Sequence, residues 1–350
     1  MEKLQDRLMR AVAVRRNVAA LLVACALPAA AVGCHRKAEK TAPPTPPPAV
    51  AAAPAPVKPA APPTAPAKGR AAIKHVVIIS EDGLRPDALT GVKPPVHEAI
   101  LKRAAYSLKA KTIRRASTLP SHAAMLSGFD IKEHGLFWNS WHPERGYIHV
   151  PTVFDAAKAS GGESAAFMGK RKLEHIARPV ASGGSVDVVS RPGYFCKKVV
   201  DEATKYFVEK KPEIEFIHFS DPDDLGHSDG WMSNPQLESI KSTDKCLATL
   251  VDAVAAAGLD RETLFIISAD HGGHGHNHDG KIPEDRLIPW IAWGPGIRQG
   301  HQIEADISTT DTAATALWVL GYPAPKGMIG KPVREAFEPD APLAAAAPTK

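Results

Sequence analysis

The chain has 350 residues, enough for one large domain or two small ones, and a formal net charge of +5 from 43 Lys or Arg and 38 Asp or Glu. The first 40 residues contain eight of the basic and three of the acidic residues, which leaves 35 of each sign in the remainder. A neutral body argues against a nucleic-acid-binding surface, which would show a basic excess.

Residues 1–34 predict an export signal. Four arginines precede the apolar run NVAALLVACALPAAAVG, which ends in small residues before Cys34. A basic stretch followed by an apolar core too short to span a membrane is typical of a cleaved signal peptide. The ending AVGC resembles the lipobox of bacterial lipoproteins, although Ala31 stands where Leu or Val is usual. We therefore expect a periplasmic protein anchored to the outer membrane through lipid on Cys34; an uncleaved amphipathic helix is the alternative.

Residues 35–72 predict an extended tether. The segment 41–69 contains eleven prolines among Ala, Thr and Val, and such a composition cannot bury a core. In polyproline II conformation it would reach ~90 Å. We expect a single catalytic domain over residues 73–340 and a disordered tail at 341–350.

Three apolar runs predict buried strands, and each leads into acidic residues. They are IKHVVIIS (73–80) before Glu81-Asp82, EIEFIHFS (213–220) before Asp221-Pro222-Asp223-Asp224, and TLFIIS (263–268) before Ala269-Asp270-His271. Helical patterns at 95–105 and 234–258 lie between them. Strands alternating with helices predict an α/β fold with a mainly parallel central sheet and helices on both faces.

The carboxyl ends of parallel strands meet at one edge of a sheet, so the three acidic segments should lie together. One Asp after a strand is more often a turn or cap residue, but three of them with nearby histidines favour a metal site. Carboxylate and imidazole form a mixed ligand set that suits zinc or a similar metal.

The segment STLPSHAAMLSG (117–128) predicts a helix with a proline in its first turn. Thr118 would lie at the positive end of this helix, where exposed amides favour an alkoxide and a bound anion. A threonine hydroxyl needs a base or a metal to act as a nucleophile. The competing interpretation is that Thr118 or Ser121 only caps the helix.

Taken together, the motifs resemble the alkaline phosphatase superfamily, and most closely its nucleotide pyrophosphatase/phosphodiesterase (type I phosphodiesterase) branch. The resemblance covers about residues 73–335 and includes IPWIAWGPGI and TTDTAATALWVLGYPAP near its end. It implies an alkaline-phosphatase-like three-layer sandwich. The matching segments are VIISEDGLRPD with Asp82, TLPSHAAMLSG with Thr118, HGLFWNSW with Asn139, DPDDLGH with Asp223 and His227, and ADHGG with Asp270 and His271.

The resemblance also implies two divalent metal ions, for which zinc is the first expectation. One would be held by Asp82, Thr118, Asp270 and His271, and the other by Asp223, His227 and a further histidine. His278 is our choice for that third ligand, ahead of His276 and His301. Asn139 would bind a non-bridging phosphoryl oxygen, unless it is an ordinary loop amide.

These residues imply a hydrolase of small phosphate esters, of the phosphodiester or nucleotide pyrophosphate type. A phosphomonoesterase and a phosphonate hydrolase are alternatives within the superfamily, and a zinc-buffering lipoprotein is the non-enzymatic alternative. The sequence GKRKLEH could bring Lys170, Arg171 or Lys172 to a dianionic phosphate, but a solvated charge run is the more common role of such a segment.

Aromatic and cysteine residues leave two further questions open. Phe137, Trp138 and Trp141 could form an apolar wall for a second ester group, or could pack in the core. Cys196 and Cys246 are the two cysteines outside the signal segment, and in an exported protein they could form a disulfide or remain buried thiols. The sequence does not determine the oligomeric state.

Overall fold

The three apolar runs form the centre of the sheet in the computed structural model, which describes residues 73–339. They are β1 (His75–Glu81), β5 (Ile214–Phe219) and β6 (Thr263–Ser268), and every residue in them is buried. β1 pairs in parallel with β5 on one side and with β6 on the other. Their carboxyl ends therefore lie next to one another at one edge of the sheet.

Five further strands complete an eight-stranded sheet with the order β4-β3-β5-β1-β6-β7-β2-β8. β7 runs antiparallel to both of its neighbours, and the other pairs are parallel, so the expected mainly parallel sheet is confirmed. These strands are β2 (Ala105–Lys111), β3 (Ser164–Met168), β4 (Val188–Ser190), β7 (Leu287–Trp293) and β8 (His301–Gln302).

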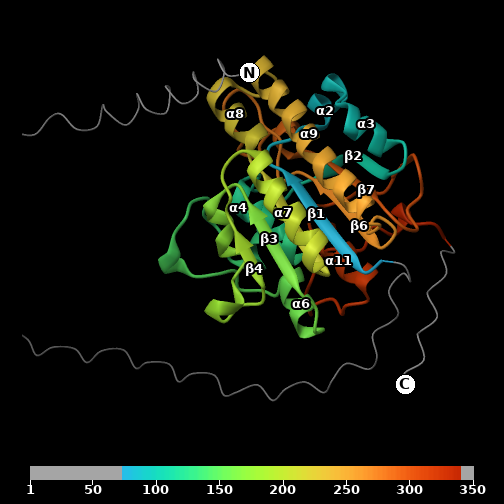
Figure 1. Ribbon diagram of the computed structural model, residues 1–350. Coiled ribbons are helices and arrows are strands. Elements are labelled where there is room, and N and C mark those ends of the chain that lie inside the picture. The colour runs from blue at the N-terminus through green and yellow to red at the C-terminus, as the bar shows by residue number, and fades with distance from the viewer. Residues whose placement is uncertain (1–72, 340–350) are drawn as a thin grey trace, which may run out of the picture. The chain divides into compact units, whose positions relative to one another are not determined.

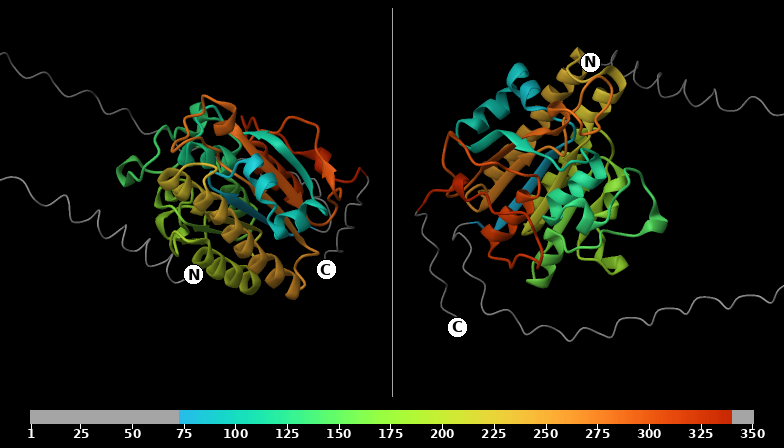
Figure 2. Two further views of the ribbon diagram at one scale, coloured as in Figure 1. Left: turned by 90° about the horizontal axis from the view of Figure 1, so that it is seen from above. Right: turned by 180° about the vertical axis from the view of Figure 1, so that it is seen from behind.

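Helices cover both faces of this sheet (Figures 1 and 2), as the alternation of strands and helices predicts. α7 (Cys196–Lys210) and α9 (Asn234–Ala256) pack together on one face, whereas α4 (Thr118–Ser127), α6 (Val153–Ala159) and α11 (Asp311–Leu320) lie on the other. The shorter helices are α2 (Pro86–Val92), α3 (Pro95–Leu101), α5 (Ile131–His134), α8 (Asp221–Asp229), α10 (Pro283–Arg286), η1 (Pro143–Arg145), η2 (Arg171–His175), η3 (Val180–Ser182) and η4 (Arg334–Ala336).

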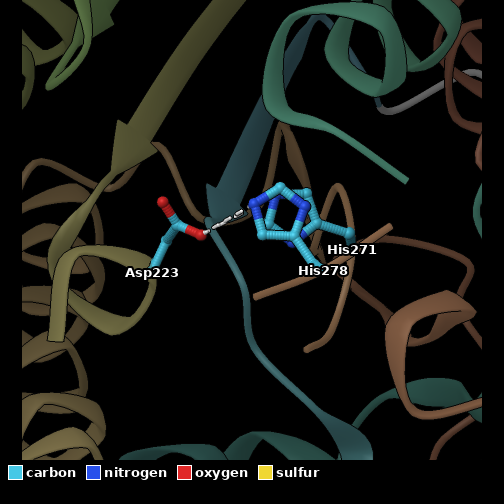
Figure 3. A group of neighbouring side chains, drawn as sticks. All are labelled: Asp223, His271 and His278. Carbon is cyan, nitrogen blue, oxygen red and sulfur yellow. Dashed lines mark ion pairs between the residues drawn. The ribbon is translucent and has the colours of Figure 1, made fainter. Parts of the chain in front are cut away.

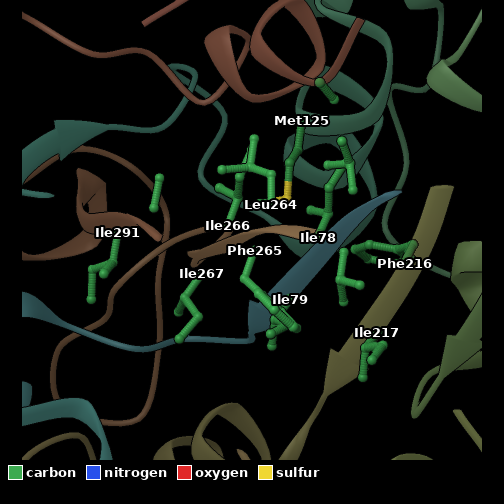
Figure 4. Close-up of a cluster of buried hydrophobic side chains, with 14 of the residues drawn as sticks. Ile78, Ile79, Met125, Phe216, Ile217, Leu264, Phe265, Ile266, Ile267 and Ile291 are labelled. Carbon is green, nitrogen blue, oxygen red and sulfur yellow. The ribbon is translucent and has the colours of Figure 1, made fainter. Parts of the chain in front are cut away.

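The core lies against both faces of the central strands (Figure 4). Ile78 and Ile266 are fully buried partners in the β1–β6 register, and Met125 of α4 belongs to the same cluster. Burial of each such side chain contributes about 1.5–3 kcal/mol relative to exposure. This packing holds the strand ends, and the acidic residues that follow them, in fixed positions.

Glu215 is an exception within β5. Its side chain is fully buried, and neither carboxylate oxygen has a hydrogen-bond partner among the described residues. Burial raises the pKa of this carboxyl well above its usual value, so the folded protein holds it in the neutral form.

We expect Glu215→Met to stabilise the fold, increasingly so as the pH rises. The folded state retains a proton that the unfolded state releases near pH 4.5, so wild-type stability falls above that pH. The loss is at most about 1.4 kcal/mol per pH unit until the raised pKa of the folded state is reached. Urea unfolding between pH 5 and 8 measures the effect, with Glu209→Met on the exposed side of α7 as control. A stability difference that shrinks with rising pH would contradict it.

The two cysteines left open by the sequence form a disulfide. Cys196 at the start of α7 is bonded to Cys246 in α9. The amide of Cys196 also donates a hydrogen bond to the Asp221 carboxylate at the start of α8, 3.0 Å away. This end of α7 is therefore fixed to both helices.

The signal segment, the tether and the tail lie outside the described residues. Among residues 73–339, no helix has the length and apolar character needed to cross a membrane.

Candidate active site

The acidic residues at the three strand ends meet as the sequence predicts. Asp82 follows β1 directly, Asp223 lies in the first turn of α8 after β5, and Asp270 lies two residues beyond β6. All three are buried. Gly83 joins them, because its amide donates to Asp270 Oδ1 at 3.2 Å and an added Cβ would lie 3.1 Å from the Asp223 Cα. Its φ of +74° also favours glycine, so the chain can turn here without separating the carboxylates.

One ligand cluster is formed by Asp223, His227 and His278. Asp223 Oδ1 lies 3.5 Å from His227 Nε2 and 3.6 Å from His278 Nε2, and the two Nε2 atoms are 3.1 Å apart. Asp223 and His227 are four residues apart on α8 and therefore share a face of that helix. Ligands of a tetrahedral zinc ion lie about 3.3 Å from one another, because each is about 2.0–2.1 Å from the metal.

Backbone carbonyls fix the orientation of the histidines. Nδ1 of His227 contacts the carbonyl of His276 at 2.9 Å, Nδ1 of His278 contacts Ala116 at 2.7 Å, and Nδ1 of His271 contacts Gly272 at 2.8 Å. A carbonyl only accepts, so each Nδ1 carries the proton and each Nε2 presents a lone pair. Lone pairs of His227 and His278 that face each other at 3.1 Å are an arrangement that a shared cation would stabilise.

A second cluster is formed by Asp82, Asp270 and His271. His271 Nε2 lies 3.2 Å from Asp270 Oδ2 and 3.5 Å from Asp82 Oδ1. The two clusters are adjacent, since His271 Nε2 is also 3.8 Å from Asp223 Oδ1 and its ring stacks on His278 with centroids 3.6 Å apart (Figure 3). In each group, Asp82–Asp270–His271 and Asp223–His271–His278, the ligand atoms lie within 4.8 Å of one another.

Thr118 is the first residue of α4, and its hydroxyl is buried without a hydrogen-bond partner. Thr118 therefore does not cap the helix, whereas Ser121, the other residue considered for that role, accepts from the Ser117 amide at 3.3 Å. Two contacts place Thr118 beside the clusters. His122 Nδ1 contacts the Thr118 carbonyl at 2.7 Å and Asp270 Oδ2 at 3.4 Å, and His278 contacts Ala116, two residues before Thr118.

The atoms that point into this site are the ones without partners. Among the described residues, four buried atoms of the two clusters and the Thr118 hydroxyl lack a hydrogen bond. The five atoms are Asp82 Oδ1, Thr118 Oγ1, Asp223 Oδ1, Asp270 Oδ2 and His271 Nε2. Buried polar atoms without partners are rare in native proteins and call for an explanation such as a bound ion. Three carboxylates, imidazoles and a hydroxyl are the ligands that zinc and similar metals take, so these residues fit the expected metals.

The pKa values of Asp82 and Asp270 are shifted in opposite directions in the metal-free protein. Burial raises the pKa of Asp82, but Lys170 and His218 outweigh it, and the pKa lies well below the usual value. Burial, with the charges of Asp82 and Asp223, raises the pKa of Asp270 well above the usual value. Burial lowers the pKa of His271 to about 4, which keeps its imidazole neutral and able to bind a metal.

Lys170 corrects the view of GKRKLEH as a solvated charge run. It directly precedes η2 and is buried, and its ammonium donates to Asp82 Oδ2 at 2.7 Å and also to Asp223 Oδ2. It thus joins the outer oxygens of one carboxylate from each cluster and leaves both Oδ1 atoms facing the site. A run of basic letters gave no signal that one of them would reach inward.

Further partners behind the site were also missed. His218 Nε2 contacts Asp82 Oδ2 at 3.0 Å. His97 lies between Glu81 Oε1 at 2.9 Å and Asp244 Oδ1 at 2.8 Å, and it connects the end of β1 to α9. Burial lowers the pKa of His97, but the two carboxylates outweigh it and raise the pKa to about 9. No sequence pattern links His218 or His97 to the acidic strand ends, because only the fold makes these residues neighbours.

Asn139, which follows α5 in the chain, contacts the first turn of α4. Its Oδ1 accepts from the Leu119 amide at 2.9 Å and from the Lys172 ammonium at 3.3 Å. With the carbonyl oxygen held by two donors, the amide nitrogen is directed away from both. Trp138 and Trp141 pack on His175, whereas Phe137 is 52% exposed.

The other histidines of the 271–278 tract have different partners. His274 Nδ1 contacts Asp285 at 2.7 Å, and His276 Nδ1 contacts the His227 carbonyl at 3.1 Å. His301 lies on β8 and pairs with Glu335 at 3.0 Å, which keeps it apart from Asp223. Of the candidates for the third ligand, the structure brings only His278 to Asp223 among the described residues.

The fold and the family match place the chain in the alkaline phosphatase superfamily. Residues 76–314 match the family described as type I phosphodiesterase / nucleotide pyrophosphatase, which is more than half of the chain. The protein belongs to that family.

Similar proteins share this fold. The structure resembles murine ectonucleotide pyrophosphatase / phosphodiesterase 5, an inactive variant in complex with AMP, with a TM-score of 0.65 and 15% identity over 76% of this chain and 100% of that one. It resembles a phosphonate monoester hydrolase from Silicibacter pomeroyi with a TM-score of 0.56 and 16% identity over 75% and 76%. GPI ethanolamine phosphate transferase 1 of Saccharomyces cerevisiae is 21% identical in an alignment 308 residues long that covers 74% of this chain and 33% of that relative. The chain thus spans about a third of that relative's length.

Proposed function

We propose that this protein hydrolyses small phosphate esters with Thr118 as the nucleophile and two divalent metals, most simply zinc, as cofactors. The observation that carries the proposal is that four buried ligand atoms without hydrogen-bond partners lie in two adjacent clusters, beside the segment that carries the equally unpartnered Thr118 hydroxyl. Asp82, Thr118, Asp270 and His271 would hold one metal, and Asp223, His227 and His278 the other.

The reaction proceeds in two displacements at phosphorus. The Thr118 oxygen forms a bond to phosphorus as the bond to the leaving oxygen breaks, and the leaving alcohol takes up a proton. Water then attacks the phospho-threonine, releases phosphate or a phosphomonoester, and returns the proton to Thr118. Bound divalent metals would lower the pKa of the hydroxyl and of water and offset charge on the leaving oxygen. Asn139 directs its amide nitrogen to a non-bridging oxygen.

Family membership makes phosphodiesters and nucleotide pyrophosphates the first substrates to test. Phosphomonoesters are the second candidate, because Lys172 places a cation beside Asn139. The test compares p-nitrophenyl phosphate, bis-p-nitrophenyl phosphate and thymidine 5'-monophosphate p-nitrophenyl ester, with and without added zinc. Inactivity on all three despite full metal loading would reject the proposal and favour a zinc-buffering role.

His278→Ala is expected to remove about one equivalent of tightly bound metal, because it deletes one of the three proposed ligands Asp223, His227 and His278. His276→Ala is the matched control, since that side chain contacts the backbone of His227 and not Asp223. Metal content after gel filtration, measured by plasma mass spectrometry, gives the answer. Equal losses in both variants would show that His278 is not the third ligand.

We also propose that the protein is exported and held at the outer membrane by lipid on Cys34, with the Pro-rich segment as a tether. The balanced charge of the remainder of the chain supports a small-molecule substrate rather than a nucleic acid. Mass spectrometry of the membrane fraction would detect acylation of Cys34, and an unmodified, uncleaved N-terminus would reject it.

A further inference from the structure

Lys170, Arg171 and Lys172 follow β3 in the chain, and each of them makes a different contact. Lys170 is engaged by Asp82 and Asp223. Arg171 lies over the Trp141 ring, 4.9 Å from its centroid. Lys172 is half-buried and has no carboxylate within ion-pair distance among residues 73–339; its ammonium contacts Asn139 Oδ1 at 3.3 Å. Lys172 is therefore the one of the three whose cation contacts Asn139.

The position of Lys172 is tied to that of Thr118. Asn139 accepts from Lys172 and from the amide of Leu119, the residue that follows Thr118 at the start of α4. Burial and the neighbouring charge of Lys170 lower the pKa of Lys172, and the charges of the three nearby aspartates oppose this shift only in part. Because the Lys172 ammonium contacts Asn139, it lies on the side where the non-bridging oxygens of a phosphoryl group attacked by Thr118 would lie.

The number of charged oxygens differs between substrate classes. A phosphomonoester presents up to two negative charges over three non-bridging oxygens, and a diester presents one charge over two. A cation that contacts these oxygens stabilises the more highly charged group more strongly, because the interaction scales with charge. Lys170 already offsets part of the carboxylate charge, so an additional cation is not needed to balance the ligands themselves.

We propose that Lys172 is a specificity-determining residue whose ammonium binds a non-bridging phosphoryl oxygen and raises phosphomonoester hydrolysis relative to phosphodiester hydrolysis. This inference rests on the proposed function, since it concerns the same pocket. It assigns the phosphoryl end of the substrate two polar contacts from this chain, the Asn139 amide and the Lys172 ammonium.

The test compares Lys172→Met, Lys172→Arg and wild type on p-nitrophenyl phosphate and bis-p-nitrophenyl phosphate. We expect Lys172→Met to lower the monoester-to-diester ratio of kcat/KM about tenfold or more, as loss of a charge-assisted hydrogen bond would. Lys172→Arg keeps the charge and should keep most of the ratio. Lys205→Met, an exposed lysine of α7, should leave both activities unchanged. Equilibrium binding of inorganic phosphate should weaken by a similar factor in Lys172→Met alone.

The outcomes separate the possible failures. Equal loss of both activities in Lys172→Met would show that Lys172 only orients Asn139, and it would overturn the inference while the proposed function stands. An unchanged ratio with unchanged phosphate binding would overturn it as well. Wild-type inactivity on both esters, with full metal content, would reject the proposed function and the inference with it.

Discussion

Thr118→Ala is expected to lower kcat/KM on p-nitrophenyl esters by on the order of 10⁴-fold or more, because the variant lacks the hydroxyl that we propose as the nucleophile. The Thr118 hydroxyl is buried, has no hydrogen-bond partner and stands at the first residue of α4. Because this hydroxyl makes no hydrogen bond in the fold, we expect the variant to fold. Single-turnover and steady-state assays with the metal-loaded protein measure the effect.

Two controls decide what a loss of activity would mean. Thr118→Ser keeps the hydroxyl and should retain much more activity than Thr118→Ala. Metal content should stay close to wild type in both variants, because Asp82, Asp270 and His271 still surround the first metal position. Wild-type turnover by Thr118→Ala would exclude the phospho-threonine mechanism.

Lys170→Met is expected to destabilise the metal-free protein by roughly 3–5 kcal/mol, the usual cost of removing one partner of a buried charge pair. Asp82 and Asp223 would then be buried close together without the ammonium that now contacts both. Divalent metal should restore part of this loss, because a cation that binds only the folded state adds stability with concentration. Stabilisation by zinc should therefore be larger in Lys170→Met than in wild type.

Urea unfolding in EDTA and in zinc measures both parts of this prediction. Lys205→Met removes an exposed lysine from α7 and serves as the control for a change of charge alone. If Lys170→Met and wild type unfold at the same urea concentration in EDTA, Lys170 does not supply the counter-charge that its contacts indicate.

Much of the site was predictable because the carboxyl ends of parallel strands lie at the same edge of a sheet. The apolar runs before Asp82, Asp223 and Asp270 are buried on both faces and become neighbours in the order β5-β1-β6. The pattern of buried strand followed by acid therefore predicts both the fold and the edge at which the acids meet. The choice of His278 rested on resemblance, and the structure brings that side chain to Asp223.

Local sequence predicted the three central strands, the acidic residues that follow them and the candidate nucleophile, since hydrophobic period and turn residues are read over a few neighbours. Tertiary structure alone decided that Lys170 turns inward and Lys172 reaches Asn139, and that Cys196 bonds to Cys246. It also decided that Glu215 is buried without a partner. Each of these depends on which distant segment supplies the neighbour. A side chain two residues along from another can face a different environment, and sequence composition does not record that difference.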